Sequence, residues 1–212
     1  MNPNDFKAQL KVAYDKDALR RVNVERNREE WKIRFREEFA DLLQREGKKT
    51  VLELGAGICS DSKFFQDNGF EVLATDLSDE MVARSRENGV RAQVADLYQI
   101  DELGEKFDGI YSMNVLLHVP RADLEMVLEK IHQALNPGGL FFYGVYGGTD
   151  EEKIITDKSK MGLPRLFSFL SDKTIQEAVA NWFDILSFET VDIDSPTPDF
   201  CFQALLLRRK EQ

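Results

Sequence analysis

The feature that most constrains the fold is an alternation of short apolar runs with helical patterns between residues 51 and 146. Five runs are apolar and short enough to be buried strands, and most are closed by a glycine or an acid. The segments between them repeat apolar residues at helical spacing. Because strand, helix and strand in succession give a right-handed parallel crossover, this order predicts a doubly wound α/β sheet. The predicted strands are residues 51–54, 70–75, 90–95, 107–114 and 140–146.

The N-terminal segment has a different pattern. It is highly charged, and Trp31, Phe35 and Phe39 recur at the spacing of one helix face, which predicts N-terminal capping helices. Gly47, followed by two lysines, is typical of a helix end. We therefore expect an N-terminal helical cap over residues 1–46 and a second unit over residues 47–212.

The C-terminal third is less regular. Residues 147–164 are polar and rich in turn formers, which predicts a loop or a lid, and residues 172–180 have a helical pattern. A short connection with two prolines joins the last two predicted strands, 184–193 and 200–209, so we expect an antiparallel hairpin at the sheet edge. Together with the five earlier runs, this hairpin predicts a mostly parallel, seven-stranded sheet.

The charge balance limits the partners. The chain has 212 residues, a net charge of -10 and a pI near 4.8, which argues against nucleic acid as a general partner because phosphate backbones require a basic surface. Residues 16–49 have the opposite balance, with 11 Lys or Arg against 8 Asp or Glu. Such a stretch is typical of a solvated helix face, although it is also compatible with an RNA contact.

The sequence has no sign of a membrane span, a signal peptide or a metal centre. No apolar run reaches the roughly 20 residues that a membrane helix needs. Cys59 and Cys201 are far apart, and His118 and His132 lack the spacing of a zinc pair. We therefore expect a soluble, cytoplasmic protein that is a monomer or a homodimer, does not contact membranes and requires no metal.

Residues that indicate a ligand follow three of the predicted strands. Gly55 and Gly57 come directly after the first strand, where glycines let the backbone turn tightly and approach a ligand. Asp76 closes the second strand, 21 residues after Gly55, where a carboxylate can accept hydrogen bonds from ribose hydroxyls. Asp96 closes the third strand, where a carboxylate can accept a hydrogen bond from the amine of an adenine. The sequence therefore predicts an adenosine-containing ligand.

A nicotinamide dinucleotide is a competing ligand of this kind. Its fingerprint has a third glycine near position 60, where this chain has Ser60. It also gives no reason for Asp96 or for the Asn-Pro-Gly-Gly turn at residues 136–139. These residues alone still do not separate a nucleotide from S-adenosylmethionine.

Five motifs in order resemble those of the class I, seven-stranded S-adenosylmethionine-dependent methyltransferases, which have a Rossmann-like fold. Each motif is moderately specific, whereas five in the correct order and spacing are strongly specific. The resemblance covers about residues 48–147 and the terminal hairpin, which in that family places the seventh strand antiparallel between the fifth and the sixth. It implies S-adenosylmethionine as the cofactor. The motifs are residues 51–65, 73–81, 94–97, 107–119 and 135–140.

The resemblance also implies where the cofactor binds. The glycine loop would surround its methionine end, Asp76 would hold the ribose, and the residues around Asp96 would read the adenine edge. Asn114 would flank the sulfonium and open toward the acceptor. In similar methyltransferases N-terminal helices close the pocket, with Tyr14 near the methionine end. The full set of implied cofactor residues is Tyr14, Glu53, Gly55, Ala56, Gly57, Asp76, Leu77, Met81, Asp96, Leu97 and Asn114.

One position departs from the family pattern. The family often has glycine where this chain has Cys59. The extra side chain must either point away from the cofactor or touch it, and we favour the first arrangement.

Direct in-line displacement of a methyl group from a sulfonium mainly requires that the acceptor be aligned. A carboxylate or an amine needs little further help, whereas a hydroxyl usually needs its proton removed. His118, just after the fourth strand, is the candidate catalytic base. A histidine in such a loop can also be purely structural.

The candidate substrate-pocket residues are Arg36, Tyr146 and Arg165. Either arginine can pair with an anionic acceptor group, but Arg36 also suits an ordinary helix face and Arg165 an acid of the protein itself. Tyr146 can line the pocket or pack in the core. Because both ends of the chain would cap the pocket, we favour a small-molecule methyl acceptor. The alternatives are a non-catalytic adenosine- or S-adenosylmethionine-binding module and an RNA methyltransferase.

Overall fold

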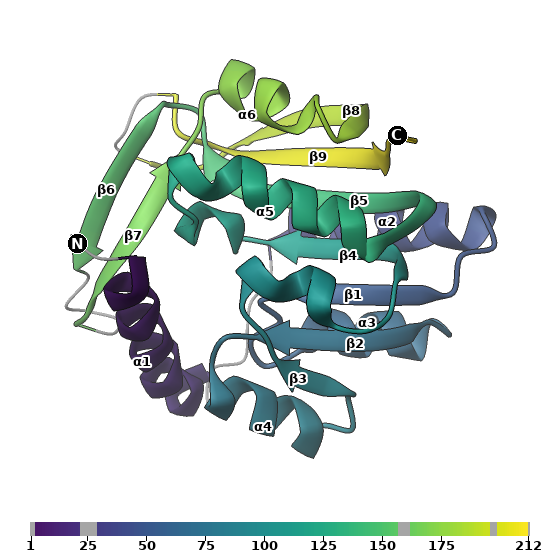
Figure 1. Ribbon diagram of the computed structural model, residues 1–212, viewed down its shortest axis with the longest axis horizontal. Helices are drawn as coiled ribbons and strands as arrows, with labels where there is room; N and C mark the ends of the chain where they lie inside the picture. The colour runs from purple at the N-terminus through teal and green to yellow at the C-terminus, as the bar shows by residue number, and fades with distance from the viewer. Residues whose placement is uncertain (1–2, 22–28, 157–161, 196–198, 212) are drawn as a thin grey trace.

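The computed structural model describes residues 3–21, 29–156, 162–195 and 199–211, and its centre is a seven-stranded sheet (Figure 1). The strand order is β3-β2-β1-β4-β5-β9-β8, with β1 to β5 parallel and β9 antiparallel to both of its neighbours. This confirms the predicted fold class and the antiparallel C-terminal pair. The strands are β1 (Thr50–Leu54), β2 (Glu71–Asp76), β3 (Ala92–Val94), β4 (Phe107–Met113), β5 (Leu135–Gly147), β8 (Phe183–Asp192) and β9 (Cys201–Arg209).

Helices cover both faces of the sheet, as in other doubly wound folds. Helices α2 and α3 pack on one face, α5 and α6 pack on the other, and α4 packs against β2 and β3 (Figure 1). Helix α1 lies beside the carboxyl edge of the parallel strands. Within the described ranges, no helix combines the length and the apolar character needed to cross a bilayer. The helices are α1 (Pro3–Arg21), α2 (Glu30–Arg45), α3 (Ser60–Asp67), α4 (Asp79–Glu87), α5 (Arg121–Ala134), α6 (Asp172–Val179), and the 3₁₀ helices η1 (Leu97–Glu102) and η2 (Leu116–His118).

Local sequence explains where α4 begins and where α2 ends. The Ser78 hydroxyl accepts a hydrogen bond from the Met81 N–H at 3.1 Å and so caps the N-terminus of α4. Gly47 follows the end of α2 with a φ of 68°, in the left-handed region that glycine adopts at low cost. Its N–H donates to the Gln44 carbonyl at 3.0 Å.

Aromatic side chains hold α2 against the sheet. Phe39 of α2 packs on Tyr111 of β4 with ring centroids 5.8 Å apart. Tyr111 in turn stacks on Phe142 of β5, at 4.9 Å and an interplanar angle of 15°. Burial of each such ring contributes roughly 1.5–3 kcal/mol. Helix α2 lies within the predicted cap of residues 1–46 and adds Phe35 and Leu43 to the buried core. The boundary between residues 46 and 47 stays a prediction.

Strand β5 starts earlier than the predicted residue 140. It begins at Leu135, directly after α5, and includes the Asn-Pro-Gly-Gly turn of residues 136–139. The pairing of β4 with β5 shifts in register between Phe107 and Gly109, and this irregularity accommodates the turn within the strand.

The structure corrects the predicted loop or lid over residues 147–164. Residues Glu151–Thr156 (β6) and Pro164–Phe169 (β7) instead form a separate two-stranded antiparallel sheet, while residues 157–161 lie outside the described residues. The sequence of β6 lacks the alternation of apolar and polar residues that identifies a strand, because it begins with charged residues and much of it is open to solvent. Ile154, for example, is 53% exposed. Strand β7 contacts α1 and η2 beside the sheet edge (Figure 1).

Buried His132 makes stability depend on pH. Burial lowers the pKa of this α5 side chain from 6.5, and its Nε2 bonds the Lys210 carbonyl at 2.9 Å. The unfolded chain therefore takes up the proton at a higher pH than the folded chain, so stability is lost as the pH falls through 6.5. We expect His132→Gln, which keeps an N–H donor but cannot titrate, to lose less unfolding free energy than wild type between about pH 7 and pH 5. Urea unfolding across this range tests it, and identical pH dependence in both proteins would contradict it.

Candidate functional site

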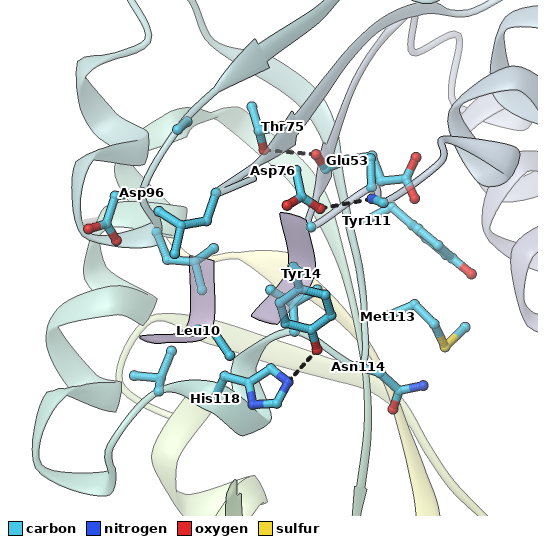
Figure 2. Close-up of a pocket in the computed structure, with 18 of the residues that line it drawn as sticks. Leu10, Tyr14, Glu53, Thr75, Asp76, Asp96, Tyr111, Met113, Asn114 and His118 are labelled. Carbon is cyan, nitrogen blue, oxygen red and sulfur yellow. Dashed lines mark hydrogen bonds between the residues drawn. The ribbon is translucent and has the colours of Figure 1, made fainter. Parts of the chain in front are cut away.

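A cavity of about 410 Å³ opens at the carboxyl edge of the parallel strands (Figure 2). Its walls come from the segments that follow β1, β2, β3 and β4, and α1 contributes a further wall. Open α/β sheets bind ligands at this edge, where the ends of adjacent strands converge. The cavity brings together eleven of the predicted site residues, which are Tyr14, Glu53, Gly55, Ala56, Gly57, Asp76, Leu77, Asp96, Leu97, Asn114 and His118.

Two left-handed glycines shape the loop after β1. Gly55 has a φ of 61° and Gly57 a φ of 57°. A Cβ added to Gly55 would lie 2.4 Å from Cγ2 of Val115, closer than side chains tolerate. The Ala56 N–H donates to the Thr75 carbonyl at 2.9 Å and ties the loop to β2. Position 55 therefore needs glycine both for its backbone angle and for its approach to Val115.

Asp76 closes β2, and its carboxylate joins two loops. The Gly57 N–H donates to Oδ2 at 2.9 Å (Figure 2), and the Ser78 N–H donates to Oδ1 at 2.9 Å. These donors fix the carboxylate at the cavity wall, where a carboxylate is able to accept hydrogen bonds from a ligand. Glu53, 4% exposed, accepts a hydrogen bond from the Ser62 hydroxyl beside this loop.

Asp96 caps η1 and is also contacted by α1. Its Oδ1 accepts from the Tyr98 N–H at 3.1 Å, and its Oδ2 pairs with the Lys7 ammonium at 2.8 Å. The Lys7 ammonium lies 3.3 Å from the centroid of the Tyr98 ring. Sequence reasoning missed Lys7. The signal that could have found it is the spacing of Lys7, Lys11 and Tyr14 by four and three residues, which places them on one helix face.

Further charged contacts fasten α1 to the start of α4. The Lys11 ammonium pairs with Asp79 at 2.6 Å and with Asp15 at 2.9 Å. The Ser78 hydroxyl donates to Asp15 at 2.5 Å. Burial would raise the pKa of Asp15, but its hydrogen bonds with Ser78 and Lys11 outweigh burial and hold the pKa below its usual value. Among the described side chains of α1, residues 7–16, polar contacts therefore fasten the helix over the cavity.

His118 lies between α1 and β7. Its Nδ1 is 2.7 Å from the Leu166 carbonyl oxygen, and its Nε2 is 2.8 Å from the Tyr14 hydroxyl (Figure 2). Because a carbonyl oxygen can only accept, Nδ1 carries the proton. In the neutral ring Nε2 is then an acceptor, so the Tyr14 hydroxyl donates to it. The imidazole is 7% exposed, and both side chains line the cavity.

The residue after β4 has a strained backbone and an unsatisfied acceptor. Asn114 has a φ of 60°, and its N–H donates to the Gly144 carbonyl at 2.8 Å. Its Oδ1 is buried and has no hydrogen-bond partner among the described residues. Left-handed non-glycine residues and buried unpaired acceptors are both uncommon outside functional sites. Asn114 therefore presents an acceptor that a ligand's donor can satisfy.

Four predicted site residues are absent from the described part of the cavity wall, and Met81 and Arg165 are two of them. Met81 is fully buried in α4, and Arg165 lies in β7 with its guanidinium 5.0 Å from the Phe167 ring centroid. Cys59 is also buried away from the wall, in a small apolar cluster that includes Val82. The roles assigned to Met81 and Arg165 stay predictions.

The other two substrate-pocket candidates have partners within the protein. Arg36 pairs with Asp61 at 3.1 Å, and its guanidinium lies 3.8 Å from the Phe64 ring centroid. The Tyr146 hydroxyl accepts a hydrogen bond from the Lys32 ammonium at 3.2 Å. Within the described residues neither Arg36 nor Tyr146 lines the cavity, whereas their neighbours Asp61 and Lys32 do. Their roles toward an acceptor stay predictions.

Comparisons with known sequences indicate a family. A family model described as a methyltransferase domain matches residues 24–186. A malonyl-[acyl-carrier protein] O-methyltransferase from Hamiltonella defensa is 28% identical over 142 residues, which cover 64% of this chain and 54% of that protein. A ubiquinone biosynthesis O-methyltransferase from Chelativorans sp. is 36% identical over 89 residues, 38% of this chain and 34% of that protein. The chain spans about half the length, or less, of these curated relatives.

Solved structures share the fold. The 1,6-didemethyltoxoflavin-N1-methyltransferase of Burkholderia thailandensis, solved with 1,6-didemethyltoxoflavin and S-adenosylhomocysteine, has a TM-score of 0.73. It is 23% identical, and the match covers 100% of this chain and 92% of that chain. The magnesium protoporphyrin IX methyltransferase of Synechocystis has a TM-score of 0.69 at 15% identity, with 96% of this chain and 100% of that chain covered. At these identities the likeness concerns the fold.

The substitution Gly55→Ala should damage both stability and ligand binding. Gly47→Ala is the matched control, because its φ is also left-handed at 68° but an added Cβ meets nothing within 4 Å. The left-handed region costs either alanine roughly 1–2 kcal/mol, so any excess at position 55 measures the clash with Val115. We expect Gly55→Ala to lose more unfolding free energy and to bind S-adenosylhomocysteine at least about tenfold more weakly. Equal destabilisation of both variants with unchanged calorimetric affinity would contradict this.

Proposed function

Because the chain belongs to the methyltransferase-domain family of class I S-adenosylmethionine-dependent enzymes, we propose that it transfers a methyl group from S-adenosylmethionine to a small-molecule acceptor. The observation that carries the proposal is the cavity in which the Gly55 loop meets the Asp76 carboxylate, held by two backbone donors. S-adenosylmethionine, the cofactor of this family, supplies a methyl group activated on a sulfonium for direct in-line displacement.

Residues of the cavity fit this cofactor at three places. The Asp76 carboxylate can accept from ribose hydroxyls, and the Asp96 carboxylate can accept from the adenine amine. The buried Asn114 Oδ1, unpaired among the described residues, suits the ammonium of the methionine end. These residues follow β2, β3 and β4, so they would hold the cofactor along the sheet edge and leave the edge of β5 to the acceptor.

A small acceptor is supported by what surrounds the cavity. Helix α1 provides one wall, and β7 supports His118 from behind through the Leu166 carbonyl. The cavity of about 410 Å³ is in the usual range for small-molecule sites and must also hold the cofactor, so the room left for an acceptor is small. Among the similar proteins, one is named for 1,6-didemethyltoxoflavin, which is a small molecule, and another for a malonyl group on a carrier protein.

Tyr14 and His118 supply a route for a proton. An acceptor hydroxyl in the cavity can donate its proton to the Tyr14 oxygen while Tyr14 passes its own proton to Nε2 of His118. The resulting imidazolium keeps its Nδ1–H on the Leu166 carbonyl. His118 therefore acts through Tyr14 and activates an acceptor whose reacting atom carries a proton.

A screen for product tests the proposed activity. With S-adenosylmethionine present, we expect S-adenosylhomocysteine to be released with the small-molecule fraction of a cell extract and not with total RNA. Asp76→Ala should sharply reduce release by weakening cofactor binding at least about 100-fold, because two charge-assisted hydrogen bonds of about 1.5–3 kcal/mol each are lost. Asp67→Ala is the matched control, since it removes a carboxylate that is 58% exposed, lies at the end of α3 and is absent from the described cavity wall. Release with RNA alone would overturn the acceptor class, and release with neither would overturn the activity.

The proton route predicts a distinctive pH profile. With an acceptor from that screen, Tyr14→Phe and His118→Asn should each lower kcat by roughly 10²- to 10⁴-fold. The wild-type rate should fall at acid pH, because a protonated imidazole cannot accept the Tyr14 proton. His118→Asn should flatten this acid limb. A variant that lost rate but kept the wild-type acid limb would show that His118 has only a structural role.

A further inference from the structure

We propose that Lys32 binds an anionic group of the methyl acceptor, and that Glu29 occupies this lysine until the acceptor arrives. The inference rests on the proposed function and narrows its acceptor class to molecules with a carboxylate or a phosphate. The Lys32 ammonium pairs with the Glu29 carboxylate at 2.8 Å and donates to the Tyr146 hydroxyl at 3.2 Å. Both Lys32 and Glu29 line the cavity.

The position of Lys32 places it at the acceptor end. Its partner Tyr146 lies near the carboxyl end of β5, two residues beyond Gly144, whose carbonyl accepts the Asn114 N–H. Asp76 closes β2, and β1 and β4 lie between β2 and β5. Neighbouring strands are about 4.8 Å apart, so Tyr146 lies roughly 14 Å across the sheet from Asp76. Lys32 is therefore remote from the nucleoside end of the cavity.

Of the two lysines on the described cavity wall, Lys32 is the one placed to bind an acceptor. Lys7 also lines the cavity, but it pairs with Asp96 at the β3 end. Arg36, a candidate from sequence, is held by Asp61. A cation at this end would position the anionic part of an acceptor beside Asn114 and Tyr146.

The present partner of Lys32 is easily replaced. Glu29 is 51% exposed, and exposed ion pairs contribute little because water and salt screen them. The Lys32 side chain is 22% exposed, and its ammonium lies 4.8 Å from the Trp31 ring centroid. An aromatic face attracts a cation without neutralising its charge. An acceptor anion that displaces Glu29 therefore forms a full ion pair with the Lys32 ammonium. Glu29 thus keeps the lysine neutralised between turnovers.

The rings around Lys32 indicate suitable probes. Tyr146, which accepts the Lys32 hydrogen bond, stacks on Phe200 with ring centroids 6.0 Å apart, so aromatic rings back this lysine behind the described cavity wall. Two matched pairs differ mainly in charge: 4-hydroxybenzoate with 4-hydroxybenzamide, and phenyl phosphate with phenyl sulfamate. Each is titrated calorimetrically into the protein saturated with S-adenosylhomocysteine. The first pair tests a carboxylate and the second a phosphate.

We expect at least one anion to bind tenfold or more tightly than its neutral counterpart. Lys32→Met should abolish this preference, Lys32→Arg should retain it, and Glu29→Gln should tighten anion binding several-fold. Lys63→Met and Asp67→Asn are the matched controls, since they break an exposed ion pair of 2.6 Å on α3 and should change nothing.

The possible failures are distinguishable. If S-adenosylhomocysteine does not bind the wild-type protein, the proposed function and this inference both fall. If it binds but no anion is preferred over its neutral counterpart, or if Lys32→Met keeps the preference, this inference alone is overturned. Melting temperatures of the variants with bound S-adenosylhomocysteine establish that each is folded.

Discussion

The site depends on one carboxylate that accepts two backbone hydrogen bonds. Asp76 ends β2, and its oxygens receive the N–H groups of Gly57 and Ser78. The first bond fixes the glycine loop after β1, and the second fixes the turn into α4. Asp76 therefore orders both loops at the cavity before a ligand binds. Because the acceptor ends β2 and both donors lie in turns that this carboxylate holds, the cavity is preorganised, which reduces the ordering cost of binding.

The aromatic core makes this edge rigid from below. Tyr111 and Phe142 stack on adjacent strands, and Phe39 of α2 packs on Tyr111. Helix α2 is thereby anchored on the sheet at its middle, while its first turn carries Lys32 to the cavity. The same helix thus links the core with the acceptor end. Close packing in such cores transmits a displacement rather than absorbing it.

Local sequence patterns predicted the fold and the sheet side of the cavity. Gly55, Asp76 and Asp96 could be placed because each follows an apolar run, and parallel strands bring such positions to one edge. The contact of Tyr14 with His118 joins residues 104 apart in sequence, so no local pattern indicated it. The β6–β7 sheet was missed because exposed strands lose the apolar alternation on which such predictions depend.

Helix α1 buries only Ala13 completely among its described side chains over residues 7–16. Its hold on the cavity comes from polar groups, such as the Lys7 ammonium on Asp96 and the Lys11 ammonium on Asp79. Coulombic contacts near a surface weaken as ions accumulate around them, whereas apolar contacts do not. The ionic contacts that hold α1 at the cavity therefore weaken as the ionic strength of the surroundings rises, whereas the apolar packing of the sheet below does not.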